Sequence, residues 1–479
     1  MEVSHLVSVF RRSPTLKSGI WYLFSDFAYK GLAFLTIPVF TRLLTLDEYG
    51  IVSVYTSLVG ITVVVTGLEI NVAVGRASLD FKHEYSAFLS SVLSFSLLPF
   101  FLTFIAVCFL SESIGTLVTM DSKLLMLAVI TGYATFVFKF YTHHLLFKQK
   151  YIMKSLLQIS KAILEVVLAI VLVTIIRGSK HYGRIYSTLA VSILFMVISF
   201  IVILLNSKKI YFPKAWFYSL RIGVPLIPHA LSAVLLSQFD RIAIQTLVSS
   251  EQAGLYSFAY NIGMIPLVLL GATNSAWMPW FYRQLSNEKT ERIKKAASIY
   301  SVAFLTITIA IMMLGPELAI IMAPNAYSSA SRIIPVISLS YLFQFLYSLY
   351  VNFAIYRKKT FAISIGTLMA GIVNIILNIL TIPKFGYEVA AWTTVISYFL
   401  LFIFHWVNVR FLLGYKVIPV RDMLVIAAIG TAIAFQQYAV SLTFSPYSLE
   451  ERFLRILVSS VAMMFIIVYG LKSKLSEKF

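Results

Sequence analysis

Charged residues are scarce in this sequence, at 12% of 479 positions, whereas an average soluble domain carries roughly 25%. Cysteine is nearly absent. The single Cys108 leaves no disulfide framework and no cysteine-based metal site. The sequence also lacks Walker A, GxSxG and HExxH motifs, and no His/Cys cluster has metal-ligand spacing. We therefore expect no metal site, no enzyme of these classes, and no ATP-driven step within this chain.

Long apolar runs are the dominant feature. Hydrophobic residues make up 59% of the chain, the mean hydropathy is +0.87, and a helix needs about 20 apolar residues to cross a membrane. The runs are continuous rather than alternating, which favours helices over a β-barrel. We predict an all-α integral membrane protein with about fourteen transmembrane helices. These lie near residues 18–40, 49–74, 86–110, 117–140, 152–176, 184–206, 219–247, 252–282, 296–323, 331–356, 361–382, 388–412, 421–441 and 453–471.

The excess of positive charge is the next feature, with 39 Lys+Arg against 20 Asp+Glu. The basic residues lie in short gaps between apolar runs, so we expect no nucleic-acid partner. With the N-terminus cytoplasmic, roughly 27 of them fall on the cytoplasmic side and roughly 10 on the other. This bias predicts a multi-pass membrane protein with both termini cytoplasmic. The gaps are too short for a soluble domain, and the run 18–40 is expected to be a retained helix.

A weak internal repeat divides the chain. The segment from Glu48 to Ser53 resembles that from Glu251 to Ser257, about 204 residues later, and Phe147-Lys148-Gln149-Lys150 resembles Tyr356-Arg357-Lys358-Lys359, about 209 residues later. The offset corresponds to six helices, an even number, so the two halves would share one orientation in the membrane. We predict an N-lobe over residues 1–206 and a C-lobe over 207–412. Helices 13 and 14 with the C-terminal tail occupy residues 413–479.

Ionisable residues inside the predicted spans are candidates for a cavity, because burying a charge at the bilayer centre costs about 2.5–3.5 kcal/mol. In the first span, Asp26 and Lys30 stand four residues apart on one helix face. They form either a structural ion pair or part of a binding cavity. In the fifth span, Lys161 and Glu165 repeat this spacing. There, Lys161 either faces the cavity or extends to the lipid headgroups.

The seventh and eighth spans contain residues that interrupt helices. Pro225 and Pro228 remove two backbone donors from the seventh span, and Pro266 lies in the eighth. We predict a break in the seventh helix and hinges at all three prolines. His229 follows directly, and is either a cavity residue that titrates near neutral pH or a structural histidine.

Further polar candidates occur in the C-terminal half. Asp240 and Arg241 either form a structural ion pair or line the cavity, and Asn261 belongs to the eighth span. In the eleventh span Asn374 is part of a seam of small and polar residues, which either packs against another helix or lines the cavity.

Several motifs together resemble a known family. They are the segment Arg221-Ile222-Gly223-Val224-Pro225-Leu226-Ile227-Pro228, the pair Asp240-Arg241, the segment Ala253-Gly254-Leu255-Tyr256-Ser257, and Phe40-Thr41-Arg42-Leu43-Leu44 followed by Glu48-Tyr49-Gly50. The chain resembles the polysaccharide-exporter (O-antigen flippase) branch of the multidrug/oligosaccharidyl-lipid/polysaccharide (MOP) superfamily. The resemblance implies a MATE-like fold of two pseudo-symmetric six-helix lobes plus two C-terminal helices, in the bacterial inner membrane.

The same resemblance implies alternating access of a cavity lined by helices 1, 2, 7 and 8. The expected cargo is an oligosaccharide linked to undecaprenyl diphosphate, from O-antigen, capsule or exopolysaccharide synthesis. Lys30 and Lys161, with Arg42 or Arg241, would meet the diphosphate. Membrane lipids and the polysaccharide polymerase machinery are expected partners. No cofactor is expected beyond a coupling ion, H⁺ or Na⁺. The alternatives are a MATE-type drug/cation antiporter and a membrane enzyme of polysaccharide assembly such as a polymerase.

Overall fold

The computed structural model describes residues 31–444 and 447–475, with side chains of the last helix up to residue 464. Within this part every regular element is helical. The chain divides into two compact units, residues 1–234 and 235–479. The boundary falls inside one helix, later than the predicted lobe boundary at 206/207, and each unit is described separately. The two-lobe repeat itself stays a prediction.

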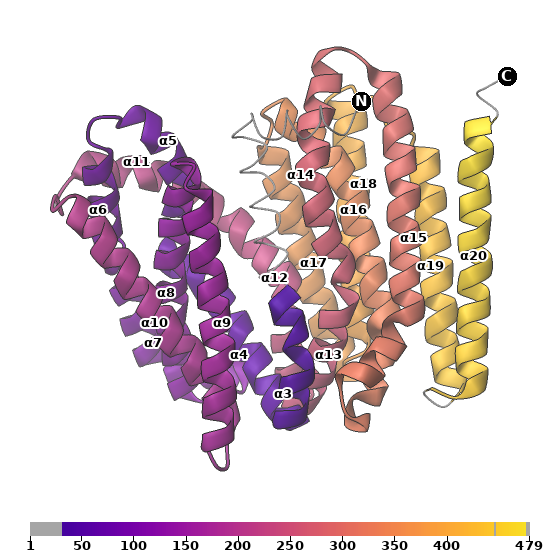
Figure 1. Cartoon of the computed structure of the whole chain (residues 1–479), viewed down its shortest axis with the longest axis horizontal. Coiled ribbons are helices and arrows are strands. Elements are labelled where there is room, and N and C mark those ends of the chain that lie inside the picture. The colour runs from indigo at the N-terminus through magenta and orange to yellow at the C-terminus, as the bar shows by residue number, and fades with distance from the viewer. Residues whose placement is uncertain (1–30, 445–446, 476–479) are drawn as a thin grey trace, which may run out of the picture. The chain divides into compact units, whose positions relative to one another are not determined.

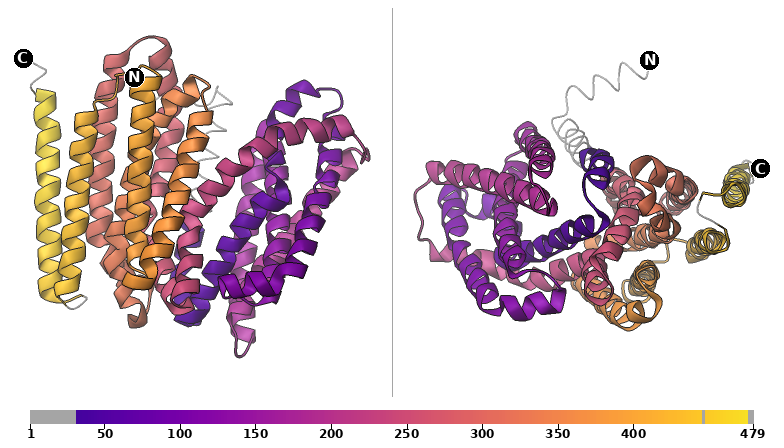
Figure 2. Two further views of the ribbon diagram at one scale, coloured as in Figure 1. Left: turned by 180° about the vertical axis from the view of Figure 1, so that it is seen from behind. Right: turned by 90° about the horizontal axis from the view of Figure 1, so that it is seen from below.

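The first unit is built from helices that run back and forth (Figures 1 and 2). They are α3 (Ile37–Leu43), α4 (Leu46–Gly67), η1 (Ile70–Val72), α5 (Ala73–Asp80), α6 (Tyr85–Phe95), α7 (Leu97–Val118), α8 (Ser122–Phe147), α9 (Tyr151–Ile175), α10 (His181–Asn206), α11 (Pro213–Gly223), η2 (Val224–Leu226) and the first part of α12 (Ile227–Leu247).

Helix α8 is the central helix of this unit, because 72% of the residues in its most apolar stretch are buried. It packs against α4 at two glycines. A Cβ at Gly67 would lie 2.1 Å from the Phe136 ring, and one at Gly132 would lie 2.1 Å from the Thr62 hydroxyl oxygen. Small residues let membrane helices approach closely enough for van der Waals packing to hold them together. The glycines therefore set the α4–α8 contact.

The second unit continues with the remainder of α12 and a second bundle. Its helices are α13 (Ser250–Gly263), α14 (Ile265–Ser286), α15 (Thr290–Met322), η3 (Asn325–Ile333), α16 (Ile334–Tyr356), α17 (Phe361–Phe385), α18 (Val389–Val407), the π-helical turn η4 (Asn408–Leu412), α19 (Val420–Thr443) and α20 (Leu449–Leu475). Figure 1 shows α15, α19 and α20 side by side along much of their length.

Helix α16, together with the preceding η3, is the most buried span of this unit. In its most apolar stretch, 83% of the residues are buried. A Cβ at Gly263 would lie 2.6 Å from Ile337, and one at Gly430 would lie 2.4 Å from Leu342. The same close-packing device thus joins α13 and α19 to α16. The predicted repeat equates α8 with α16, and each is the span with the largest buried share in its own unit.

The repeated sequence motif has a local structural role. Thr45 and Glu48 form a capping box at the start of α4, and Ser249 accepts a hydrogen bond from the Gln252 amide at the start of α13. Such caps satisfy backbone donors that a helix leaves unpaired at its first turn. The similarity around Glu48 and Glu251 therefore marks two helix starts.

The expectation of a helical multi-pass membrane protein is confirmed. Twelve spans in the described residues are long and apolar enough to cross a membrane, and a shorter apolar helix covers Gly31–Leu43. The first predicted span lies mostly outside the described residues. The second, predicted over 49–74, ends at Gly67 because Leu68 and Glu69 adopt positive φ angles of 46° and 51°. The described part thus supports about twelve to thirteen of the roughly fourteen predicted spans.

Candidate functional site

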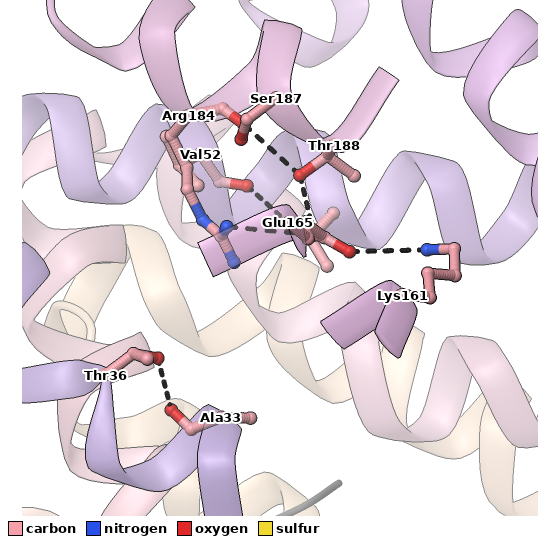
Figure 3. A network of polar contacts seen from close by, with 9 residues as sticks. Ala33, Thr36, Val52, Lys161, Glu165, Arg184, Ser187 and Thr188 are labelled. Atoms are coloured by element: carbon pink, nitrogen blue, oxygen red, sulfur yellow. Dashed lines mark hydrogen bonds and ion pairs between the residues drawn. The ribbon is translucent and has the colours of Figure 1, made fainter. Parts of the chain in front are cut away.

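A charged cluster lies within the membrane spans of the first unit, centred on Glu165 of α9 (Figure 3). The Lys161 Nζ lies 3.3 Å from Glu165 Oε2. From α10, Arg184 Nη1 lies 3.7 Å from Glu165 Oε1, and the Thr188 hydroxyl donates to the same oxygen at 2.8 Å. One carboxylate therefore faces two cations, and the cluster carries a net positive charge.

The cluster is shielded from solvent. Lys161 and Arg184 side chains are 10% and 22% exposed, and the Arg184 guanidinium lies 4.6 Å from the centre of the Phe40 ring of α3. Lys161 is ten residues from the start of α9, about 15 Å along the helix. Lys161 is paired with Glu165 and buried within the first unit. Whether it faces the cavity or lies near the headgroups stays a prediction.

A second polar cluster of this unit surrounds Glu69, at the break between α4 and η1. Glu69 is buried and its Oε1 lies 3.2 Å from Lys139 Nζ of α8. His143 and His229 both interact electrostatically with Glu69. The buried Nδ1 of His229 accepts or donates no hydrogen bond among the described residues. The role of His229 as a cavity residue stays a prediction.

The seventh predicted span is broken where the prolines indicated. The chain passes from α11 through the 3-10 turn η2, which contains Pro225, to α12, whose second residue is Pro228. Just before the break, Gly223 lies so close to the α4–η1 break that a Cβ there would be 2.5 Å from the Leu68 carbonyl oxygen. Two interrupted helices thus contact each other at their breaks. Whether they bend in transport stays a prediction.

In the second unit, a fully buried carboxylate belongs to Asp240 of α12. Its Oδ2 accepts hydrogen bonds from the Tyr256 hydroxyl at 2.5 Å and the Thr394 hydroxyl at 2.8 Å. Its Oδ1 accepts one from Asn378 Nδ2 at 2.6 Å. Three neutral donors from α13, α17 and α18 therefore surround one charge.

Arg241 makes its contacts with other groups, as expected for adjacent helical residues, which do not share a face. Its guanidinium lies 4.2 Å from the centre of the Tyr260 ring and donates to Gln238 Oε1 at 3.0 Å. Asp240 and Arg241 form no ion pair with each other in the described part of the chain. The ion-pair interpretation of this dipeptide is therefore wrong.

The polar seam of the eleventh span does join helices. Asn374 is buried and donates from Nδ2 to the Thr394 hydroxyl at 3.4 Å. Asn378 donates to Asn374 Oδ1 at 3.2 Å and accepts from the Thr393 hydroxyl at 2.5 Å. The seam of α17 therefore packs against α18 and also completes the surroundings of Asp240.

The other sequence candidates are dispersed. Asp26 and Lys30 lie outside the described residues. Arg42 is exposed at the end of α3, where its Nη1 donates to the Pro38 carbonyl at 2.9 Å. Asn261 lies in α13, half-buried, and Pro266 lies in the first turn of α14, where the eighth predicted span is interrupted at Met264.

Sequence reasoning missed the partners of these groups. Arg184 stands at the very start of an apolar run, and Thr188, Tyr256 and Thr394 are hydroxyl residues of a kind that recurs along every span. Their positions in sequence carry no signal for a contact with Glu165 or Asp240.

The two sites differ in the chemistry they suit. Lysine and arginine bind phosphate as a point charge and as a planar fork respectively, so the Glu165 cluster suits an anion. Around Asp240, the carboxylate and two hydroxyl oxygens lie together, and oxygen atoms are the ligands that hard cations prefer. No group of three His, Cys, Asp or Glu side chains that suits a metal ion occurs among the described residues.

The fold is similar to that of solved transporters. A structure described as "Lipid II flippase MurJ, inward closed conformation" matches with a TM-score of 0.67 at 17% identity, over 96% of this chain and 98% of that one. An inward-facing multidrug resistance MATE family transporter of the MOP superfamily matches with a TM-score of 0.60 at 14% identity, over 82% of this chain and 96% of that one. The fold is therefore that of the MOP superfamily.

Sequence comparison identifies the family within this fold. "Lsg locus putative protein 1" of Haemophilus influenzae is 24% identical over 323 residues, which cover 63% of this chain and 74% of that protein. An uncharacterized membrane protein of the same organism is 24% identical over 376 residues, covering 74% and 87% respectively. The family model described as "Polysaccharide biosynthesis protein" matches residues 15–285, more than half of the chain. The chain belongs to this polysaccharide biosynthesis protein family, and is a multi-pass membrane protein with a MOP transporter fold.

Proposed function

We propose that the protein moves a polyprenyl-diphosphate-linked oligosaccharide across the bacterial cytoplasmic membrane by alternating access. The observation that carries this proposal is the net positive cluster of Lys161, Glu165 and Arg184 inside the membrane spans. A polysaccharide biosynthesis family and a transporter fold agree with a cargo of this kind.

The physical argument concerns the diphosphate of the cargo. A phosphate charge cannot enter hydrocarbon without a compensating partner, because desolvating an unpaired ion costs many kcal/mol. Arg184 and Lys161 offer such partners at membrane depth. Glu165 holds both cations in place while the site is empty, and yields them to a competing phosphate oxygen. The prenyl chain stays in the lipid throughout.

Transport of a defined lipid-linked oligosaccharide in proteoliposomes tests this role. Replacing Arg184 by Gln removes a charge-assisted hydrogen bond worth about 1.5–3 kcal/mol, so we expect transport to fall about 10- to 100-fold. Arg184→Lys should recover part of it. The matched control is Arg177→Gln, which removes an exposed cation from the α9–α10 loop and should leave transport unchanged. Equal rates for Arg184→Gln and the native protein would contradict the proposal.

We further propose that Asp240 is the coupling carboxylate. A buried ionisable group within a membrane span is a functional candidate by default. The Tyr256 and Thr394 hydroxyls can rotate to present oxygen instead of hydrogen, so a Na⁺ ion or a proton can replace the present hydrogen bonds. Collapsing the Na⁺ and H⁺ gradients separately, in native protein and Asp240→Asn, tests this role. If transport by Asp240→Asn still depends on the driving gradient, Asp240 is not the coupling carboxylate.

The antiporter alternative requires a different outcome. A MATE-type drug antiporter would move organic cations, which the two cations beside Glu165 disfavour. Uptake of a cationic dye by the same proteoliposomes, with no movement of lipid-linked oligosaccharide, would favour it. Turnover of the oligosaccharide into longer chains would instead favour a membrane polymerase.

A further inference from the structure

A polar cavity lies at one end of the second unit and shares no lining residue with the sites described above. Its volume is about 430 Å³. Its walls include Thr290, Glu291 and Lys294 of α15, Arg410 of η4, Lys416 of the following loop, and Val420 of α19. The proposed transport function assigns no role to this cavity.

The backbone at the end of α18 creates the cavity. The helix ends in the π-helical turn η4, in which the Leu413 amide donates to the Asn408 carbonyl at 2.9 Å. The Tyr415 amide donates to the Val409 carbonyl at 3.0 Å, and Gly414 has a φ of 76°, a left-handed conformation that glycine adopts without strain. π-helical turns are rare and are frequently found at functional sites. This turn places Arg410 and Lys416 on the same cavity.

The charge of the cavity is positive. Lys294 is paired with Glu291 at 3.7 Å, whereas Arg410 and Lys416 have no carboxylate within ion-pair distance among residues 31–444 and 447–464. The first turns of α15 and α19, which also border the cavity, contain Glu291 and Asp422, so the helix N-termini add no net positive charge there. The cavity is therefore lined by three cations, Lys294, Arg410 and Lys416, against the single lining carboxylate of Glu291, and this net positive charge suits an anion.

The position of the cavity indicates which class of anion it can bind. It lies where three membrane spans end: Thr290–Met322, Val389–Leu412 and Val420–Thr443. Beside it, Phe411 and Leu412 are 68% and 71% exposed, as apolar side chains are when they face acyl chains. A ligand with a phosphate and an adjoining hydrocarbon chain matches both the basic cavity and the apolar surface of Phe411 and Leu412. A free phosphate matches only the basic cavity. Basic pockets between transmembrane helices at the membrane surface bind anionic lipid headgroups in other proteins.

We propose that this cavity binds the phosphate of an anionic phospholipid headgroup, of the phosphatidylglycerol type. Arg410 and Lys416 contact the phosphate oxygens, and the acyl chains lie along Phe411 and Leu412. The bound lipid holds together the ends of α15, α18 and α19, and makes the stability of this unit depend on the anionic lipid content of the membrane.

The test uses the full chain purified in a neutral detergent and titrated with dioctanoyl-phosphatidylglycerol, with native mass spectrometry counting the bound lipids. We expect one saturable lipid, and dioctanoyl-phosphatidylcholine should not replace it. The double variant Arg410→Gln/Lys416→Gln should bind at least about tenfold more weakly, because each basic residue near a membrane surface contributes on the order of 1 kcal/mol. The matched control Lys208→Gln/Lys214→Gln, which removes two exposed cations of the first unit, should bind as the native protein does.

Three results would overturn the proposal. Unchanged affinity of the Arg410/Lys416 variant would remove the cavity from lipid binding. Equal competition by inorganic phosphate or glycerol 3-phosphate would make it a site for free phosphate. Preferential displacement of the lipid by undecaprenyl diphosphate would assign it to the transported cargo. Arg410→Lys, which keeps the charge, should retain binding and shows that loss in the double variant is not misfolding.

Discussion

Replacing Glu165 by Gln is expected to destabilise the first unit strongly. The change keeps the size of the side chain and its acceptor for the Thr188 hydroxyl, but removes the charge that lies 3.3 Å from Lys161 and 3.7 Å from Arg184. Two cations whose side chains are only 10% and 22% exposed then lose their partner. Removing one member of a buried ion pair costs about 3–5 kcal/mol. Because Arg184 retains some access to water, we expect about 3 kcal/mol.

The double-variant cycle isolates the interaction. Lys161→Met should cost only about 1 kcal/mol, because Glu165 keeps Arg184 and Thr188 as partners. The combined variant Lys161→Met/Glu165→Gln should be no less stable than Glu165→Gln alone, which gives a coupling energy of about 1–2 kcal/mol. The assay is thermal unfolding of the purified protein in detergent, followed by tryptophan fluorescence. Additive effects of the two substitutions would refute the contact between Lys161 and Glu165.

Three further predictions follow from other contacts. Gly132→Ala should destabilise the α4–α8 packing by about 1–3 kcal/mol, because its Cβ would lie 2.1 Å from the Thr62 hydroxyl oxygen. The control Gly60→Ala, whose Cβ would lie 3.4 Å from its nearest neighbour, should be tolerated in the same thermal assay. The pKa of Asp80 at the end of α5 is lowered by a hydrogen bond from the Tyr218 hydroxyl and, to a smaller extent, by one from Arg76. The stabilisation of the fold by the Asp80 carboxylate is therefore complete above about pH 4. It is lost as the pH falls through the lowered pKa. Tyr218→Phe should reduce that acid-dependent loss, and an unchanged profile from pH 7 to pH 3 would contradict the contact. Thr394→Val should weaken ion coupling without abolishing cargo binding, measured as transport with and without the gradient.

The spans of this chain could be predicted because a membrane demands about 20 continuous apolar residues, a condition visible in sequence. The break in the seventh span was equally visible, since Pro225 and Pro228 remove backbone donors wherever they stand. By contrast, the surroundings of Asp240 join residues 138 and 154 positions away along the chain. Such contacts depend on how helices pack, which no local spacing encodes.

The pairing of Asp240 with Arg241 failed as an interpretation for the same reason. Adjacent residues on a helix project in different directions, so Arg241 meets Tyr260 while Asp240 meets Tyr256, Asn378 and Thr394. At Lys161 and Glu165 the spacing of four residues did predict the contact. It could not predict Arg184, which comes from the next helix.

The central claim is that the charges around Glu165 face water in at least one state of the transport cycle. Its most direct test is thiol labelling of Thr188→Cys in a Cys108→Ser background, using a membrane-impermeant maleimide applied from each side of the membrane. We predict labelling from at least one side, and slower labelling when a polyprenyl-diphosphate-linked oligosaccharide is present. A cysteine at position 188 that reacts from neither side, while a lipid-soluble maleimide labels it readily, would contradict the account.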